Sequence, residues 1–159
     1  MRTWVKVTFG GAALVGVAVV VLAGTGAYFV LRHMEKRAAA ETAADQAIEI
    51  VKARFGTRPP LIEIVDPRTL DIRINRPVEP SPAPVDTLHV MNWKGETGEL
   101  VSTDIPVWLM RFSTVNIASQ LGLTPAKFQL TVDDVRRYGP GIVVDYGSRG
   151  SFRVFVWVE

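Results

Sequence analysis

Residues 151–158 read Ser-Phe-Arg-Val-Phe-Val-Trp-Val, and this regular alternation predicts a strand. Successive side chains of a strand point to opposite sides of a sheet. One face of this run carries a phenylalanine and three valines, and the other carries Arg153, Phe155 and Trp157. The sequence therefore predicts a strand with one wholly apolar face. On the opposite face, Phe155 and Trp157 are predicted to form an exposed aromatic pair.

Further apolar runs indicate that this strand belongs to a set of hairpins. The run 142–146 leads into it through the turn 147–150, which begins and ends with glycine. Two other runs flank the segment 94–98, which also holds two glycines. Short apolar runs bounded by glycine, proline and polar residues are typical of strands. The strands predicted on either side of 94–98 are Thr87–Trp93 and Glu99–Ile105. Leu61–Val65 and Leu70–Ile74 are two further predicted strands, which would form either a hairpin or two sequential edge strands.

Two or three short helices are expected among these strands. The clearest runs from Thr131, which can cap it, to Gly139, with two acids in its first turn and two arginines in its last. Pro106 suits a first helical position and predicts a helical stretch over 107–112, and 115–121 is a further candidate. The proline-rich segment 77–84 is predicted to be an extended spacer, with a recognition site for a proline-binding groove as the alternative.

Residues 32–55 are rich in Ala, Glu, Lys and Arg and predict a stalk helix. Gly56 ends this pattern, and two prolines prevent it from resuming. Ala44, Ile48, Val51 and Phe55 fall on one face at helical spacing. We expect this stripe to pack on the chain's own domain, with a short coiled-coil seam between two chains as the alternative.

Residues 7–31 contain no charged side chain and predict a transmembrane helix. A helix of this length spans about 37 Å, more than the roughly 30 Å hydrocarbon core of a bilayer. A cleaved signal peptide is the alternative, but the uncharged run exceeds its usual apolar region. The basic flanks on the two sides nearly balance, so orientation rests on the usual signal-anchor arrangement.

The predicted fold class is α+β, with an N-terminal transmembrane helix continuing into a stalk helix and then a small domain of short strands with two or three short helices. The lipid bilayer is the expected partner of Val7 to Leu31. The chain is predicted to be a single-pass membrane protein, with its C-terminal domain outside the cytoplasm. The predicted boundaries are 1–6 for the tail, 7–31 for the membrane helix, 32–55 for the stalk and 56–159 for the domain.

Composition and chemistry exclude several classes of function. The net charge is only +2, so no nucleic-acid partner is expected. The chain has no cysteine, which excludes disulfides and thiolate sites. His33 and His89 stand apart from any serine-triad or zinc spacing, and no catalytic residue, cofactor or metal ligand is predicted. Asp104 and Asp145 are the carboxylates that an unrecognised hydrolase would use.

Local patterns in the last part of the chain carry a resemblance. They are the run from Asp104 to Arg111, the run Thr131-Val132-Asp133-Asp134, the run Tyr138-Gly139-Pro140-Gly141, and the final Trp157-Val158-Glu159. Together they resemble a group of uncharacterised bacterial single-pass membrane proteins. This resemblance implies a bacterial context, in which the expected location of the single-pass chain is the inner (cytoplasmic) membrane, and it implies no particular chemistry.

These observations favour a non-catalytic interaction or structural module, anchored to the membrane of the bacterial envelope, that binds another protein or itself. The alternatives are a small membrane-bound hydrolase that uses carboxylates and a cytoplasm-facing, membrane-tethered regulator. Aromatic and arginine side chains are enriched at protein interfaces. The predicted partner-binding residues are accordingly Trp108, Arg111, Arg136, Arg137, Phe155 and Trp157.

Overall fold

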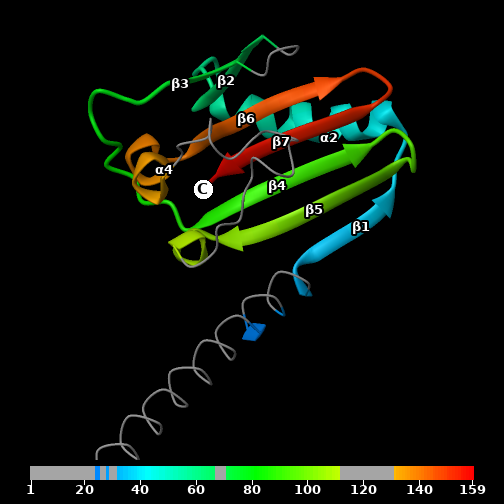
Figure 1. The fold of residues 1–159 in the computed structure, drawn as a ribbon, viewed down its shortest axis with the longest axis horizontal. Helices are drawn as coiled ribbons and strands as arrows, with labels where there is room; N and C mark the ends of the chain where they lie inside the picture. The colour runs from blue at the N-terminus through cyan, green and yellow to red at the C-terminus, as the bar shows by residue number, and fades with distance from the viewer. Residues whose placement is uncertain (1–23, 26–27, 29–31, 67–70, 112–130) are drawn as a thin grey trace, which may run out of the picture. The chain divides into compact units, whose positions relative to one another are not determined.

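The computed structural model describes residues 24–25, 28, 32–66, 71–111 and 131–159. The chain divides into two units, Met1–His33 and Met34–Glu159. The second unit is built on one seven-stranded sheet with the strand order β1-β5-β4-β7-β6-β2-β3 (Figure 1). The strands are β1 (Met34–Ala38), β2 (Ile62–Asp66), β3 (Asp71–Ile74), β4 (Thr87–Lys94), β5 (Glu99–Pro106), β6 (Gly141–Ser148) and β7 (Phe152–Val158).

Three antiparallel hairpins make up most of the sheet, and they form at the predicted runs. They are β2–β3, β4–β5 and β6–β7. An antiparallel ladder between β4 and β7, from Leu88 opposite Val158 to Lys94 opposite Phe152, joins two of the hairpins. The third hairpin joins in parallel through Ile62 opposite Val144, and the Leu61 N–H donates to the Ile142 carbonyl at 2.9 Å. All three hairpins therefore share one sheet.

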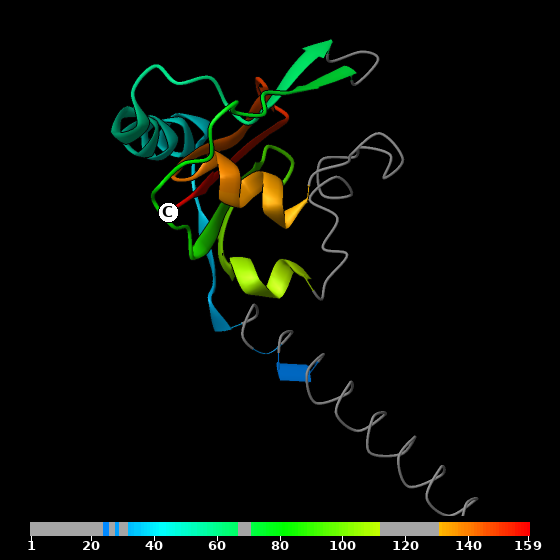
Figure 2. The same ribbon diagram turned by 90° about the vertical axis from the view of Figure 1, so that its left-hand side faces the viewer.

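Helix α2 (Glu41–Lys52) covers one face of the sheet and continues into the 3-10 turn η1 (Ala53–Phe55) (Figure 2). Ile48 packs in a buried cluster with Ile142, Phe155 and Trp157, and Val51 and Phe55 pack against this cluster. A second cluster places Ala44 with Trp93 and Leu100. The stripe predicted from the sequence thus packs on the chain's own domain.

The opposite face is covered by the 3-10 turn η2 (Val107–Arg111) and helix α4 (Val132–Tyr138) (Figure 2). The predicted cap of α4 is present, because the Thr131 hydroxyl accepts from the Asp134 N–H while the Asp134 carboxylate accepts from the Thr131 N–H. This capping box satisfies two backbone donors at the helix start. The apolar residues of these segments that are buried are Val107, Leu109, Val135 and Tyr138.

The proline-rich segment 77–84 connects β3 to β4 along this face, as the predicted spacer requires. The Ser81 N–H donates to the Arg137 carbonyl at 2.8 Å, which ties the segment to the end of α4. Gly139 has φ +74° and ψ −167°, and a Cβ at this position would overlap the Ser81 side chain. That backbone region is accessible almost only to glycine, so both the conformation and the close approach require glycine here.

The stalk helix predicted over residues 32–55 is wrong. Met34–Ala38 forms strand β1, and the helix begins only at Glu41. The helix propensities of these residue types differ by only a few tenths of a kcal/mol per residue. Tertiary context overrides such small preferences, and here Met34–Ala38 pairs with β5 over all five positions, from Met34 opposite Thr103 to Ala38 opposite Glu99.

The fold class predicted from the sequence is therefore also wrong. In the described part of the chain, no helix is long and apolar enough to cross a membrane. The transmembrane, single-pass and signal-anchor descriptions have no support there, although most of residues 7–31 lies outside the described residues. The described elements of the second unit are seven strands, two α-helices and two 3-10 turns, so the fold is mainly a sheet. The candidate helix at 115–121 also lies outside the described residues.

Packing of α2 on the sheet predicts a strong contrast between two isoleucines of that helix. Ile48 is fully buried, whereas Ile50 is 71% exposed. Ile48→Ala is expected to lower the free energy of unfolding by about 2–5 kcal/mol, because it removes buried methyl groups and leaves a cavity. Ile50→Ala is the matched control, for which the expected change is within about 0.5 kcal/mol. Urea unfolding followed by circular dichroism measures both; equal losses would contradict the described packing of α2.

Candidate functional site

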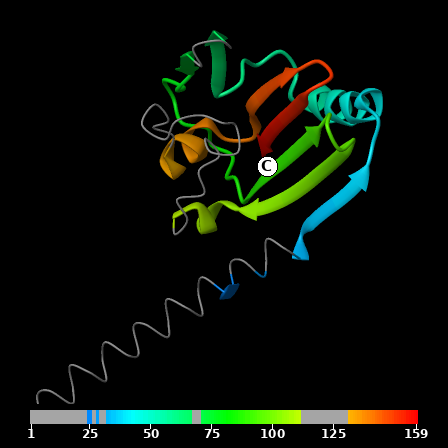
Figure 3. The same cartoon turned by 45° about the vertical axis from the view of Figure 1, so that its right-hand side comes forward.

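The outer edge of β1 is one of the two edges of the sheet, and β3 forms the other. β1 lies at the end of the strand order and pairs only with β5 (Figure 3). Four of its five residues are exposed, from Glu35 to Ala38. An exposed edge strand presents a row of peptide groups that can pair with another strand.

The hydrogen-bond pattern shows which peptide groups of β1 point outward. The Ala39 N–H donates to the Gly98 carbonyl at 2.8 Å, so residue 39 belongs to a hydrogen-bonded pair. Hydrogen-bonded and non-bonded pairs alternate along an antiparallel ladder. Arg37 and Glu35 consequently direct their peptide groups toward β5. Met34, Lys36 and Ala38 direct theirs toward the open edge.

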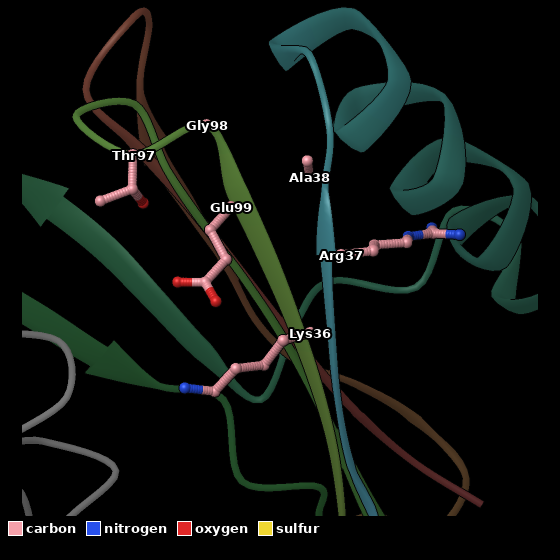
Figure 4. Close-up of a pocket in the computed structure, with 6 residues that line it drawn as sticks. All are labelled: Lys36, Arg37, Ala38, Thr97, Gly98 and Glu99. Carbon is pink, nitrogen blue, oxygen red and sulfur yellow. The ribbon is translucent and has the colours of Figure 1, made fainter.

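Charged side chains line this edge on both faces of the sheet. Lys36 and Arg37 point to opposite sides of β1, and Lys36 lies on the same side as Glu99 of β5 (Figure 4). Neither Glu35 nor Arg37 has an ion pair among the described residues. A shallow open hollow lies at the end of the strand, and its lining residues are Lys36, Arg37, Ala38, Thr97, Gly98 and Glu99.

The end of β1 is fixed by its link to α2. The Trp93 indole N–H donates to the Ala39 carbonyl at 2.8 Å. Only Ala39 and Ala40 separate the strand from the helix. The helix is itself held at the β6–β7 turn, where the Gly150 N–H donates to the Glu41 carboxylate at 2.7 Å. These contacts place β1 on the β5 edge and leave its other side open.

A second polar cluster gathers at the far end of the same sheet face. His89 Nδ1 lies 2.7 Å from Asp104 Oδ1, and the imidazole stacks on Trp157 with ring centroids 4.8 Å apart. The Trp157 indole N–H donates to Glu159 Oε1 at 3.1 Å, and Arg54 forms an ion pair with the same carboxylate at 2.7 Å. Asp104 holds the imidazole in one orientation. No group of three potential metal ligands occurs among the described residues.

The two carboxylates of the hydrolase alternative are not brought together. Asp104 is on β5 and Asp145 is on β6, with β4 and β7 between them. Neighbouring strands lie about 4.8 Å apart, so these two backbones are separated by about 14 Å. Carboxylate pairs that hydrolyse glycosides lie about 5–9.5 Å apart. The geometry therefore gives this alternative no shared cleft.

Asp145 instead belongs to an ion cluster that fastens α2 to the sheet. Arg153 pairs with Asp145 and with Asp45 of α2, and the Lys52 ammonium lies 2.8 Å from the second oxygen of Asp145. The hydrogen bond to Asp145 raises the pKa of Lys52 above its ordinary value, against the opposing effect of burial.

On the opposite face of the sheet, burial raises the pKa of Tyr138, whose ring lies under the Arg58 guanidinium at 3.9 Å.

The predicted partner-binding residues fall in two places. Phe155 and Trp157 do form a pair, with ring centroids 5.3 Å apart, but both are buried beneath α2. Their predicted exposure is wrong because the stripe of α2 covers that face of the sheet. Trp108 is 53% exposed on η2, and Arg136 and Arg137 are exposed on α4, which packs beside η2. Arg111 ends η2. The role of these residues in binding a partner stays a prediction.

The sequence analysis did not single out the residues of the β1 edge. Glu35, Lys36 and Arg37 carry no apolar alternation, which is the usual signal of a strand. The available signal was the segment of polar, charged residues before the amphipathic stripe that begins at Ala44. Short, charged strands are characteristic of sheet edges.

Comparison of the chain with protein-family models, with curated proteins and with solved structures gave no match. The resemblance to bacterial membrane proteins, carried by the runs around Trp108 and Tyr138, therefore stays a prediction.

Asp134 is the described carboxylate for which the structure predicts a clear dependence of stability on pH. Arg76 Nε lies 2.7 Å from Asp134 Oδ1, and a second guanidinium nitrogen lies 3.3 Å from the other oxygen. The hydrogen bond from Arg76, with those from Thr131, holds the pKa of Asp134 below its ordinary value of 3.8. A lowered pKa in the folded state stabilises the protein above the unfolded pKa, and this stabilisation is lost as pH falls through the folded value.

Asp134→Asn is therefore expected to lower the free energy of unfolding at pH 7 by about 1 kcal/mol, because a neutral amide replaces the carboxylate in the ion pair and the cap. The difference from the unmodified chain should shrink as pH falls below about 4. Urea midpoints between pH 2.5 and pH 7 measure this. Asp133→Asn, at the adjacent exposed position, is the control. An equal pH dependence of the two variants would contradict the assignment.

Proposed function

We propose that the folded domain is a non-catalytic interaction module that binds an extended segment of a protein partner along the outer edge of β1. The observation that carries this proposal is the one-sided pairing of β1 at an end of the sheet, together with the exposure of four of its five residues. An incoming strand that continues a sheet obtains its affinity from main-chain hydrogen bonds. The outward peptide groups of Met34, Lys36 and Ala38 supply these bonds.

Side chains along the edge supply selectivity. Charges on an edge strand oppose indiscriminate pairing with apolar strands. Opposite charges on directly facing strand residues favour pairing, and like charges oppose it. Glu35, Lys36 and Arg37 are exposed and succeed one another along the strand, so they favour a partner strand that carries acidic and basic residues in the complementary order.

The inward contacts of β1 keep this edge in place before a partner arrives. The strand pairs with β5 over its whole length, and the Trp93 indole fixes the carbonyl of Ala39. A binding edge that is already ordered does not lose further backbone entropy when a partner pairs with it. This pre-organisation supports recognition by β1 without a rearrangement of the domain.

Lys36→Pro tests the proposed edge. Proline removes the outward N–H of residue 36 but no hydrogen bond to β5, and such positions on edge strands tolerate it. A photo-crosslinking amino acid is placed at Ala38 in the full chain, and irradiation of producing cells is expected to give a discrete protein adduct. Lys36→Pro should reduce the adduct at least about tenfold, since the central main-chain bond is lost.

Lys36→Ala is the matched control, because it removes the charge and keeps the N–H group; it should give at least as much adduct as the unmodified chain. The crosslinker at Glu49, on the exposed surface of α2, should give no such adduct. Circular dichroism confirms that the proline variant stays folded. An adduct that survives Lys36→Pro unchanged would show that partners do not bind through the β1 edge.

A further inference from the structure

We infer that the strand bound by β1 is the β1 strand of a second copy of this chain, paired antiparallel with Lys36 of one copy opposite Lys36 of the other. This inference rests on the proposed function, because it names the partner of the same edge. It follows from two properties of the strand that are independent of each other. One is the position of the outward peptide groups, and the other is the order of the charges.

The outward peptide groups are symmetric about Lys36. Met34 and Ala38 lie two residues before and two residues after it, and all three direct their N–H and carbonyl groups to the open edge. An antiparallel partner with Met34 opposite Ala38 and Lys36 opposite Lys36 pairs every outward group of both copies. No outward peptide group of the described strand is left without a bond in this register.

The same register places opposite charges in contact. Glu35 of one copy faces Arg37 of the other, and the relation holds twice because the arrangement is two-fold symmetric. These are non-bonded pairs of the new ladder, in which facing Cα atoms are only about 4.5 Å apart and side chains approach most closely. Both residues are exposed and have no ion pair among the described residues, so each is available to the second copy.

The symmetry also preserves the faces of the sheet. A two-fold axis perpendicular to the sheet keeps the α2 side of one copy on the same side as the α2 side of the other. Arg37 points to one side of β1 and Lys36 to the other (Figure 4), so Glu35 and Arg37 of the two copies meet on one face. Such a contact is isologous and closes after two copies. The product is a dimer with a continuous sheet.

One like-charge pair opposes the association. The two Lys36 side chains face each other at a hydrogen-bonded position, where Cα atoms are about 5.5 Å apart. Their long stems allow the ammonium groups to diverge. Replacement of this lysine by a neutral residue should therefore strengthen the dimer, whereas removal of its N–H should abolish it. The two effects separate the role of the charge from that of the peptide group.

Charge reversal tests the register. Glu35→Arg places two arginines opposite each other at both symmetric positions and is expected to weaken dimerisation at least about tenfold at low salt. Arg37→Glu should weaken it similarly. The double variant Glu35→Arg with Arg37→Glu restores opposite charges and should restore the dimer. Sedimentation of the full chain and of the three variants measures dimerisation. A non-ionic detergent is included, because residues 7–31 form an uncharged, largely apolar run.

A cysteine at the symmetry axis tests the geometry directly, since the chain has no cysteine of its own. Lys36→Cys should form an intermolecular disulfide on mild oxidation, because facing Cα atoms about 5.5 Å apart lie within disulfide range. Glu35→Cys is the control. In this register its copies lie diagonally, about 8 Å apart, beyond that range.

A dimer with the expected charge rescue and the selective disulfide at position 36 supports the inference. A monomeric chain, or a dimer that is indifferent to charge reversal, overturns it. If the chain is monomeric while the adduct from Ala38 still depends on the Lys36 N–H, the second copy is excluded and the proposed edge function stands. If the chain is monomeric and the adduct from Ala38 does not depend on the Lys36 N–H, both the second copy and the proposed edge function are excluded.

Discussion

The packing of α2 across one face of the sheet is the constraint on which the rest of the structure depends. Ile48 lies against Phe155 and Trp157, and Ala44 lies against Trp93, so the helix covers the strands at the centre of the sheet. Large aromatic side chains bury much apolar surface each and contribute strongly to the stability of a core. Ion pairs with Asp145 and Arg153 also link the same helix to β6 and β7. The direction of α2 is therefore fixed by the sheet it covers.

The position of β1 follows from this packing. The first turns of the helix pack on the ends of β4 and β5, because Ala44 lies against Trp93 and Leu100, and only two alanines connect the helix to the preceding strand. A connection that short keeps the strand close to the start of the helix, where it pairs with the adjacent edge of β5. The strand pairs there on one side, and its other side becomes the edge of the sheet. The proposed binding surface is thus a consequence of how the core is covered, and its charges determine which strand can join it.

The sequence allowed the hairpins and α4 to be predicted, because alternation, glycine turns and helix caps are local signals. The alternating run at 151–158 predicted a strand, and β7 (Phe152–Val158) forms there. The face that carries Phe155 and Trp157 could not be called buried, since the helix that covers it lies more than a hundred residues earlier. Met34–Ala38 was predicted as helix because its composition favours helix and its pairing with β5 is non-local. The candidate site on β1 was missed for the same reason. Whether two carboxylates distant in sequence, such as Asp104 and Asp145, lie close together could be decided only from the strand order.

Residue-resolved amide hydrogen exchange along β1 tests the central claim most directly. In dilute solution the amides of Glu35 and Arg37 should exchange slowly, because they point toward β5, while those of Lys36 and Ala38 should exchange rapidly. The Lys36 and Ala38 amides should become protected as the protein concentration rises and the edges pair. Slow exchange at all four amides at every concentration, as in a continuous helix, would contradict the account, as would rapid exchange at all four.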